Sequence, residues 1–156
     1  MASLYRHTQS NRIGMLFVLG IVLLIILLEL FILRIAGVDV PVPILALATL
    51  VPSAILGLVA WVFSSLTIEV TDREVKWHFG PGVWRKQLAL TEIRTAEAVK
   101  NKWWWGWGIR YTPHGWLYNV WGLDAVELRK PDGTALRLGT DDPQRLASAI
   151  TRAARR

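Results

Sequence analysis

Histidine and carboxylate side chains are the first candidates for chemistry, because they ligate metal ions and transfer protons. The sequence has three histidines, His7, His78 and His114, and no cysteine. None of the three has another histidine or a carboxylate at the short spacing typical of a metal site, so only folding could bring them together. A nucleophile elbow, a P-loop and a GxGxxG motif after a strand are all missing. We therefore expect no enzyme activity, no metal and no cofactor.

Asp141 and Asp142 are adjacent carboxylates, which could serve as an acid–base pair. Pro143 follows them directly, and proline favours the first position of a helix, so Asp142 is better explained as the N-cap of a helix. The apolar residues of this C-terminal helix share one face: Leu146, Ala149, Ile150 and Ala153. We expect that face to cover a sheet.

Tryptophans are concentrated at residues 103–107, which read WWWGW. If this segment is extended, alternate side chains point to opposite faces, so Trp104 cannot share a core with Trp103 and Trp105. Three interpretations stay open: two indoles fill the core while the others cap its end, the cluster enters a headgroup layer, or it binds a partner protein. The candidate interaction surface comprises the cluster, its basic neighbours and one further tryptophan: Trp103, Trp104, Trp105, Trp107, Lys100, Lys102, Arg110 and Trp121.

Two apolar runs predict membrane-spanning helices at residues 13–35 and 43–66. Residues 13–33 are apolar at 18 of 21 positions, and residues 43–66 carry no charge. At about 1.5 Å per residue, each run is long enough to cross a hydrocarbon layer of about 30 Å. The first run is also too long to be the apolar core of a signal peptide. The short stretch between the runs leaves room only for a hairpin loop.

The orientation of this hairpin follows from the charges that flank it. Arg6 and Arg12 precede the first helix, the connecting loop carries Asp39, and basic residues resume at Arg73 and Lys76. Because Lys and Arg are enriched in cytoplasmic flanks, both termini are expected in the cytoplasm. Residues 1–12 are then expected to be a cytoplasmic N-terminal tail.

Small residues recur along the second helix at spacings of four, three and four: Ser53, Gly57, Ala60 and Ser64. This spacing places them on one face, where small side chains allow two helices to approach closely. We expect that face to pack on another helix, either the first helix of the hairpin or a helix of another subunit.

Glu29 is the one charged residue within residues 13–33 of the first apolar run. A charge in hydrocarbon is costly, and it raises the hypothesis of a proton relay or of a contact with a partner helix. No further acidic residue or histidine in either helix continues a relay. Glu29 also lies only about 6 Å from the end of the run, so we expect its carboxyl group to take up a proton, reach the interface or meet Arg34.

From Thr67 onward the sequence changes to short alternating stretches separated by turn residues, which is typical of antiparallel strands. Strands are expected in five places: residues 66–79 with a turn at 71–73, residues 83–90, 93–99 and 108–119, and a hairpin formed by 126–129 and 135–139. Residues 67–156 are therefore predicted to form one small α+β domain closed by the C-terminal helix.

Two stretches, GWGIRYTPHGWLYNVWGLDAVEL at residues 106–128 and LGTDDPQRLASAI at 138–150, resemble the bacterial pleckstrin-homology-like (PH-like) domain of small membrane proteins with two N-terminal helices. With the hairpin, the resemblance covers nearly the whole chain, although Trp121 stands where a small residue such as serine is expected. It implies a PH-like antiparallel β-barrel or sandwich capped by one C-terminal helix and tethered to the bacterial inner (cytoplasmic) membrane. It implies no agreed ligand and no functional residue.

The chain has 18 Lys and Arg residues against 12 Asp and Glu, a net charge of +6. These charges are scattered, whereas a nucleic-acid-binding surface concentrates them in a stripe, so no nucleic acid is expected. We expect a non-catalytic, membrane-tethered PH-like interaction module, an accessory or assembly subunit of a membrane protein complex. Its expected partners are the lipid bilayer and either another membrane protein or a second copy of the chain. The alternative is a sensor of anionic lipid headgroups that docks through the tryptophans and their basic neighbours.

Overall fold

The computed structural model describes residues 3–37 and 40–155, so Asp39 of the predicted hairpin loop lies outside the described residues. The elements are β1 (Ser3–Ser10), α1 (Arg12–Ala36), α2 (Val42–Val62), β2 (Ser65–Thr71), β3 (Glu74–Phe79), β4 (Trp84–Ala89), η1 (Leu90–Glu92), β5 (Thr95–Lys100), η2 (Trp103–Trp105), β6 (Gly108–Thr112), β7 (Gly115–Asn119), β8 (Asp124–Arg129), β9 (Ala135–Gly139) and α3 (Pro143–Ala154). They form two compact units: a helical hairpin, Arg12–Val62, and a sheet domain, Met1–Asn11 with Phe63–Arg156.

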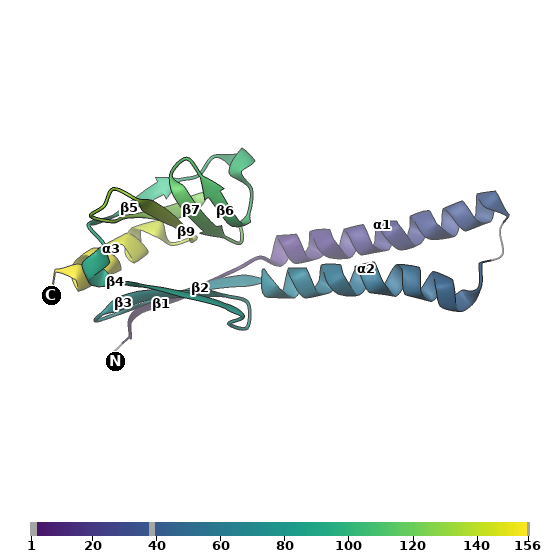
Figure 1. Ribbon diagram of the computed structural model, residues 1–156, viewed down its shortest axis with the longest axis horizontal. Coiled ribbons are helices and arrows are strands. Elements are labelled where there is room, and N and C mark those ends of the chain that lie inside the picture. Colours follow the sequence, from purple (N-terminus) through teal and green to yellow (C-terminus); the bar gives the residue numbers. More distant parts are fainter. Residues whose placement is uncertain (1–2, 38–39, 156) are drawn as a thin grey trace. The chain divides into compact units, whose positions relative to one another are not determined.

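The hairpin consists of α1 and α2, which run side by side in opposite directions (Figure 1). Both helices are long and apolar enough to cross a membrane, and the most apolar stretch of each has no residue buried inside the structure. The second helix is shorter than predicted. It ends at Val62 because Ser65 already belongs to β2 and Leu66 is buried in the core of the sheet domain.

The sheet domain contains two sheets and one C-terminal helix, which confirms the α+β class. Strands β1 to β4 form an antiparallel sheet in the order β1-β2-β3-β4, and the second sheet has the order β5-β8-β9-β7-β6. Its strands β7 and β9 are parallel, which the prediction of an all-antiparallel domain missed. Among the described residues no strand belongs to both sheets, so the sheets are not closed into a barrel.

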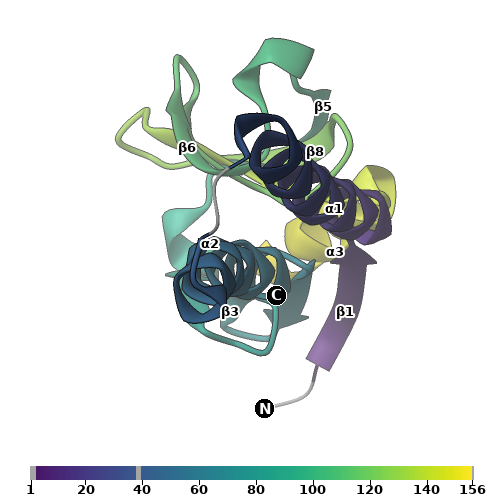
Figure 2. The ribbon, with the colours of Figure 1, turned by 90° about the vertical axis from the view of Figure 1, so that its right-hand side faces the viewer.

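One core fills the space between the two sheets and α3, which lies between them (Figures 1 and 2). Ile68 and Phe79 come from the first sheet, Val126 and Leu138 from the second, and each is at most 1% exposed. The predicted apolar face of α3 is buried there: Leu146, Ala149, Ile150 and Ala153. Burying a large apolar side chain contributes about 1.5–3 kcal/mol, so this shared core is what holds the two sheets together.

The expectation that residues 1–12 form a tail is wrong for the described part of that segment. Ser3–Ser10 is strand β1, paired with β2 in antiparallel register. The hydroxyl groups of Thr8 and Thr67 are 2.9 Å apart across that pair. The strand is mostly polar and pairs with residues more than 50 positions away, so no local pattern reveals it. The sheet domain is therefore built from chain on both sides of the hairpin.

Two side chains of β1 also contact the start of α3. His7 Nε2 bonds to an oxygen of Asp141, and the Tyr5 hydroxyl donates to Asp142 Oδ2 at 3.5 Å. Burial, followed by the Asp142 carboxylate, raises the pKa of Tyr5 to about 12. Asp142 occupies the predicted N-cap position, but its side chain makes no capping hydrogen bond because it is turned toward Tyr5. The predicted N-cap position at Asp142 and the helix start at Pro143 are therefore confirmed, without a capping hydrogen bond from the Asp142 side chain.

Candidate interaction surface

The tryptophan loop, residues 101–108, connects β5 to β6. Its centre, Trp103–Trp105, is a turn of 3-10 helix, and Gly106 follows it at φ +68°, a conformation that residues with side chains rarely adopt. Successive side chains of a 3-10 helix differ in direction by about 120°, so the premise of an extended segment is wrong. None of the loop's tryptophans is buried, which also excludes the interpretation in which two of them fill the core.

The outermost indoles of the loop belong to Trp103 and Trp104, which are 73% and 59% exposed. Their rings meet edge to face at 5.9 Å, and the Lys102 ammonium lies 5.1 Å from the centre of the Trp104 ring. Both rings thus leave apolar surface in water beside a cation. Exposed apolar patches of this kind mark binding surfaces more often than idle ones.

Trp107 and Trp121 form the base of the loop on one side. Their rings stack at 4.9 Å with an interplanar angle of 15°, and the Trp107 indole N–H donates to the Gly122 carbonyl at 3.3 Å. Arg110 Nε donates to the Trp107 carbonyl at 2.8 Å. Trp121 is half-buried against the core. Trp121 is therefore a support for the loop.

Arg137 supports the loop on the other side. Its guanidinium carbon lies 5.0 Å from the centre of the Trp105 ring, and its NH1 group donates to Asn101 Oδ1 at 3.1 Å. Arg137 also forms an ion pair with Glu127, with Nε and NH2 at 2.8 and 2.6 Å from Oε2. Both residues are buried on the face of the second sheet that lies opposite the core. The start and the centre of the loop are thus fixed to one buried cation.

Two further side chains lie close to Glu127. Arg129 Nε donates to its other oxygen at 2.8 Å, and His114 Nδ1 lies 3.8 Å from Oε2. Burial opposes ionisation of this carboxyl, but the hydrogen bond and charge of Arg137, with the charge of Arg129, hold the pKa of Glu127 below its ordinary value. Sequence reasoning missed this cluster because its residues occupy positions that alternation assigns to solvent. The predicted hairpin of residues 126–129 and 135–139 was a usable signal, since it sets Glu127 opposite Arg137.

The basic residues of the predicted surface are exposed, but they are not equivalent. Lys102 belongs to the loop and contacts Trp104. Lys100 ends β5, opposite Asp124 of β8. Arg110 is tied to the backbone of Trp107. The structure therefore unites Trp103, Trp104 and Lys102 as an exposed tip and leaves the other predicted residues as its support or flank.

The small-residue face of α2 is only partly as predicted. Ser64 lies beyond the end of the helix, where its carbonyl accepts from the Asn11 N–H at 2.7 Å. At Gly57, no described atom outside the adjoining residues and backbone of its own helix lies within 4 Å of the place where a Cβ would stand. Ser53 and Ala60 are half-buried. Close packing inside the hairpin is thus wrong at Gly57, and a helix of another subunit stays a proposal.

Glu29 is linked to α2 by a hydrogen bond. The Thr49 hydroxyl donates to Glu29 Oε2 and also lies 3.0 Å from the Leu45 carbonyl oxygen. The carboxyl group is therefore held between the two helices by Thr49, rather than by Arg34 as one sequence alternative had it. A hydrogen bond between helices is an ordinary structural role for a polar group in such a hairpin.

The histidines are not brought together. His7 contacts Asp141, His78 lies on β3, and His114 lies beside Glu127. Within residues 3–37 and 40–155, no group of three or more His, Cys, Asp or Glu residues is placed to hold a metal ion. The polar cluster around Glu127 instead contacts the tryptophan loop through Arg137.

The comparisons with known proteins assign no function to this surface, so its chemistry alone indicates what it can bind. That chemistry consists of exposed indoles, one adjacent cation and a buried support. No protein-family model matches the chain, and no curated protein matches it in sequence.

Proposed function

We propose that the chain is a non-catalytic, membrane-tethered interaction module whose tryptophan loop binds a partner protein. In this proposal α1 and α2 cross the bacterial inner membrane, both termini are cytoplasmic, and the PH-like sheet domain serves as an accessory or assembly subunit of a membrane protein complex. One observation carries the proposal. Trp103 and Trp104 are largely exposed, although the loop that bears them is fixed by contacts at both ends and at its centre.

A loop fixed in this way favours binding for two reasons. A tryptophan can bury about 150–250 Å² on association, which at about 25 cal/mol per Å² corresponds to roughly 4–6 kcal/mol for each fully covered indole. Because Arg137 and Trp121 already hold the loop, little conformational entropy is lost when a partner orders it. Tryptophan is accordingly enriched among the residues that dominate protein interfaces.

Attachment to the membrane would strengthen binding through a surface of this modest size. A domain attached to the membrane meets other membrane proteins at a high effective concentration, so a small surface can give stable association. The partner would carry its matching surface close to the membrane.

A second candidate function, binding of anionic lipid headgroups, is favoured by the place of the Trp107–Trp121 stack. Gln9 Nε2 donates to the Trp121 carbonyl at 2.9 Å, and Gln9 precedes the first residue of α1 by three positions. If α1 begins at the membrane surface, this side of the loop is close to the headgroups. Lys100, Lys102 and Arg110 would then contribute about 1 kcal/mol each near an anionic surface.

Crosslinked purification of the tagged full-length protein in mild detergent tests the proposal. The variant Trp103→Ala, Trp104→Ala is compared with Tyr111→Ala, Trp116→Ala, a matched control because those two rings are also exposed and meet edge to face at 5.5 Å. We expect a protein partner at fixed stoichiometry that the loop variant loses and the control retains.

Retention of every partner by the loop variant would contradict the proposal. The lipid alternative is tested with a fluorophore on Trp103→Cys in vesicles. Quenching of that fluorophore by headgroup-level quenchers, weakened by salt, would support headgroup binding.

A further inference from the structure

We propose that the β3–β4 segment, residues 80–86, is a second membrane contact, whose Val83 and Trp84 enter the headgroup layer next to α2. In this inference Arg85 and Lys86 bind anionic lipid phosphates at the same level. It rests on the proposed function, because it requires α1 and α2 to cross a membrane. It uses none of the residues assigned to the tryptophan loop.

Hydrogen bonds within the sheet domain tie this segment to the chain that leaves α2. The Gly80 N–H donates to the Ser65 carbonyl at 2.8 Å, and Phe79 pairs with Leu66 in the sheet. Ser65 follows Val62, the last residue of α2, by three positions, which an extended chain covers in at most about 11 Å. The segment therefore cannot lie far from the point where α2 ends.

The same end of the sheet has a fixed shape. Phe63, the first residue of the domain after α2, packs edge to face on Phe79 at 5.2 Å. The Gly82 N–H donates to the Phe79 carbonyl at 2.9 Å and closes the turn. The residues that follow the turn are thus presented at a defined place.

The segment exposes apolar side chains there. Val83 and Trp84 are 59% and 51% exposed, although Trp84 pairs in register with Phe79, which is only 1% exposed. Tryptophan is enriched at membrane interfaces, because its ring is amphipathic and its N–H finds partners among the headgroups. Two adjacent exposed apolar residues in a segment hydrogen-bonded to the chain that leaves α2 are therefore suited to that layer.

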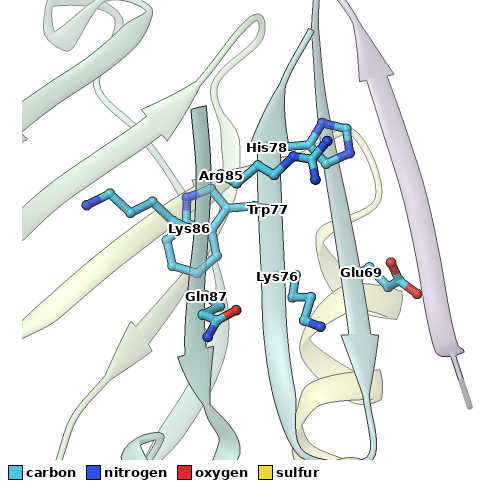
Figure 3. A pocket seen from close by; sticks show the side chains of 7 residues that line it. All are labelled: Glu69, Lys76, Trp77, His78, Arg85, Lys86 and Gln87. Carbon is cyan, nitrogen blue, oxygen red and sulfur yellow. The ribbon is translucent and has the colours of Figure 1, made fainter. Parts of the chain in front are cut away.

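The charges within the segment itself are all positive, while the pocket that Arg85 and Lys86 line also includes the Glu69 carboxylate of β2. No acidic residue occurs between Trp77 and Gln87, whereas Arg85 and Lys86 are both exposed. Arg85 lies opposite His78 in the sheet register, while Lys86 lies opposite Trp77, so the two cations occupy the two faces of the strand (Figure 3). Both faces next to Trp84 therefore favour an anionic surface.

The Arg85 guanidinium is already positioned toward the turn. Its Nε donates to the Gly82 carbonyl at 2.9 Å, which leaves its terminal N–H groups for another acceptor. Guanidinium groups bind phosphate oxygens through such paired N–H groups. The arrangement of two apolar residues, two cations and no carboxylate matches the composition of interfacial membrane segments.

A second contact would also have a consequence for the tryptophan loop. A domain joined to the membrane by the chain alone can turn about its connections, whereas a further contact at residues 80–86 limits that rotation. The contact would thereby fix the direction in which Trp103 and Trp104 are offered to a partner.

Single cysteines can test this inference directly, because the chain has none of its own. Full-length Trp84→Cys is labelled with a solvent-sensitive fluorophore in vesicles of phosphatidylglycerol and phosphatidylcholine. Two matched variants are labelled in parallel: Leu58→Cys, an exposed position within α2, and Gln87→Cys, an exposed position three residues further along β4. Val83→Cys replaces Trp84→Cys if the latter does not fold.

We expect the label at 84 to be quenched by headgroup-level lipid quenchers and several-fold less by aqueous iodide than the label at 87. The label at 58 should be quenched by quenchers attached to the acyl chains. Arg85→Glu with Lys86→Glu should return the label at 84 to water. The same charge reversal at Lys100 and Lys102 should leave it in place.

Iodide quenching at 84 equal to that at 87, with 58 still quenched by lipid, would overturn this inference and leave the membrane tether intact. Shielding of 84 from iodide without quenching by any lipid probe would overturn it too, because a protein surface would then cover the segment. Loss of lipid quenching at 58 as well would overturn the tether, and with it the proposed function.

Discussion

The helical hairpin and the sheet domain place the same kinds of side chain in opposite ways. In the hairpin, apolar side chains such as Leu16 and Phe17 are exposed, and the polar contact between Glu29 and Thr49 links the helices. In the sheet domain, apolar side chains such as Ile68 and Leu138 are buried. Water drives apolar burial, whereas lipid gives no such force between helices. This difference is the one expected if, as we propose, the hairpin lies in lipid and the sheet domain in water.

Both units nevertheless contain an exception of the same form. Glu29 in the hairpin and Glu127 in the sheet domain are acidic residues whose immediate neighbours in the chain are apolar. Each accepts a hydrogen bond from a nearby side chain. Glu127 is held by two guanidinium groups, whereas Glu29 is held by one hydroxyl. We therefore expect substitutions that disturb Glu127 to reduce stability much more than substitutions of Glu29.

The largest effect is expected from Arg137→Met. Removing one partner of a buried ion pair costs about 3–5 kcal/mol, since the remaining charge stays buried without its partner. Arg137 also contacts Trp105 and Asn101, so the tryptophan loop should loosen with it. Denaturant unfolding of the full-length protein in mild detergent measures the loss. The control Arg110→Met, at an exposed arginine, should change stability by about 0.5 kcal/mol or less.

The double variant Glu127→Leu, Arg137→Met sharpens this test, because it removes both charges and should recover most of the lost stability.

The pH dependence of stability gives an independent check. The folded pKa of Glu127 lies below its ordinary value of 4.5, so its contribution is present above that pH and is lost as the pH falls below it. Glu127→Gln should flatten this acid decline. A loss below about 1 kcal/mol for Arg137→Met would mean that Arg129 alone satisfies Glu127.

The next effect compares the same kind of deletion in the two units. Ile150→Ala empties a fully buried position on α3 and should cost about 2–5 kcal/mol. Leu58→Ala on α2 removes an exposed side chain and creates no cavity, so it should stay within about 0.5 kcal/mol. The same unfolding experiment measures both. An equal loss at the two positions would show that Leu58 is packed against protein.

The regular elements of both units could be predicted from the sequence because their patterns are local. The apolar runs marked α1 and α2, and the spacing of Leu146 and Ile150 marked the buried face of α3. Strand β1 could not be predicted, because its polar residues show no local strand pattern and are ordered only by pairing with β2, which follows the hairpin in sequence. The same is true of β7 and β9, whose parallel pairing is decided by the order of the whole sheet.

The sequence identified the tryptophan loop but neither its geometry nor its buried support. The density of tryptophans marks the loop, but its 3-10 turn is followed by Gly106 and packs on Arg137, 32 positions after Trp105. Trp121 was identified as a departure from a pattern, yet its role beneath Trp107 required the structure. Long-range partners of this kind leave no periodic signal in the sequence.

A smaller effect is expected in the hairpin. Glu29→Leu removes the hydrogen bond with Thr49 and should weaken association of the helices by about 0.6–1.7 kcal/mol, the range for such bonds in membranes. Glu29→Gln keeps an acceptor for the Thr49 hydroxyl and should change little. Denaturation of the full-length protein by a strong detergent, followed by helix content, measures both. A large loss with Glu29→Gln would show that the carboxyl group has a role beyond this hydrogen bond.

The smallest effect is expected where β1 meets α3. Tyr5→Phe removes the 3.5 Å hydrogen bond to Asp142, and at pH 7 this should cost about 0.5 kcal/mol, the low end for a hydrogen bond. The wild type should also lose stability as the pH rises from 10 toward 12, because the neutral phenol is favoured in the folded state. Tyr5→Phe should flatten that alkaline decline, whereas Tyr111→Phe, at an exposed tyrosine, should keep it. An unchanged decline in Tyr5→Phe would mean that other groups detach β1 at high pH.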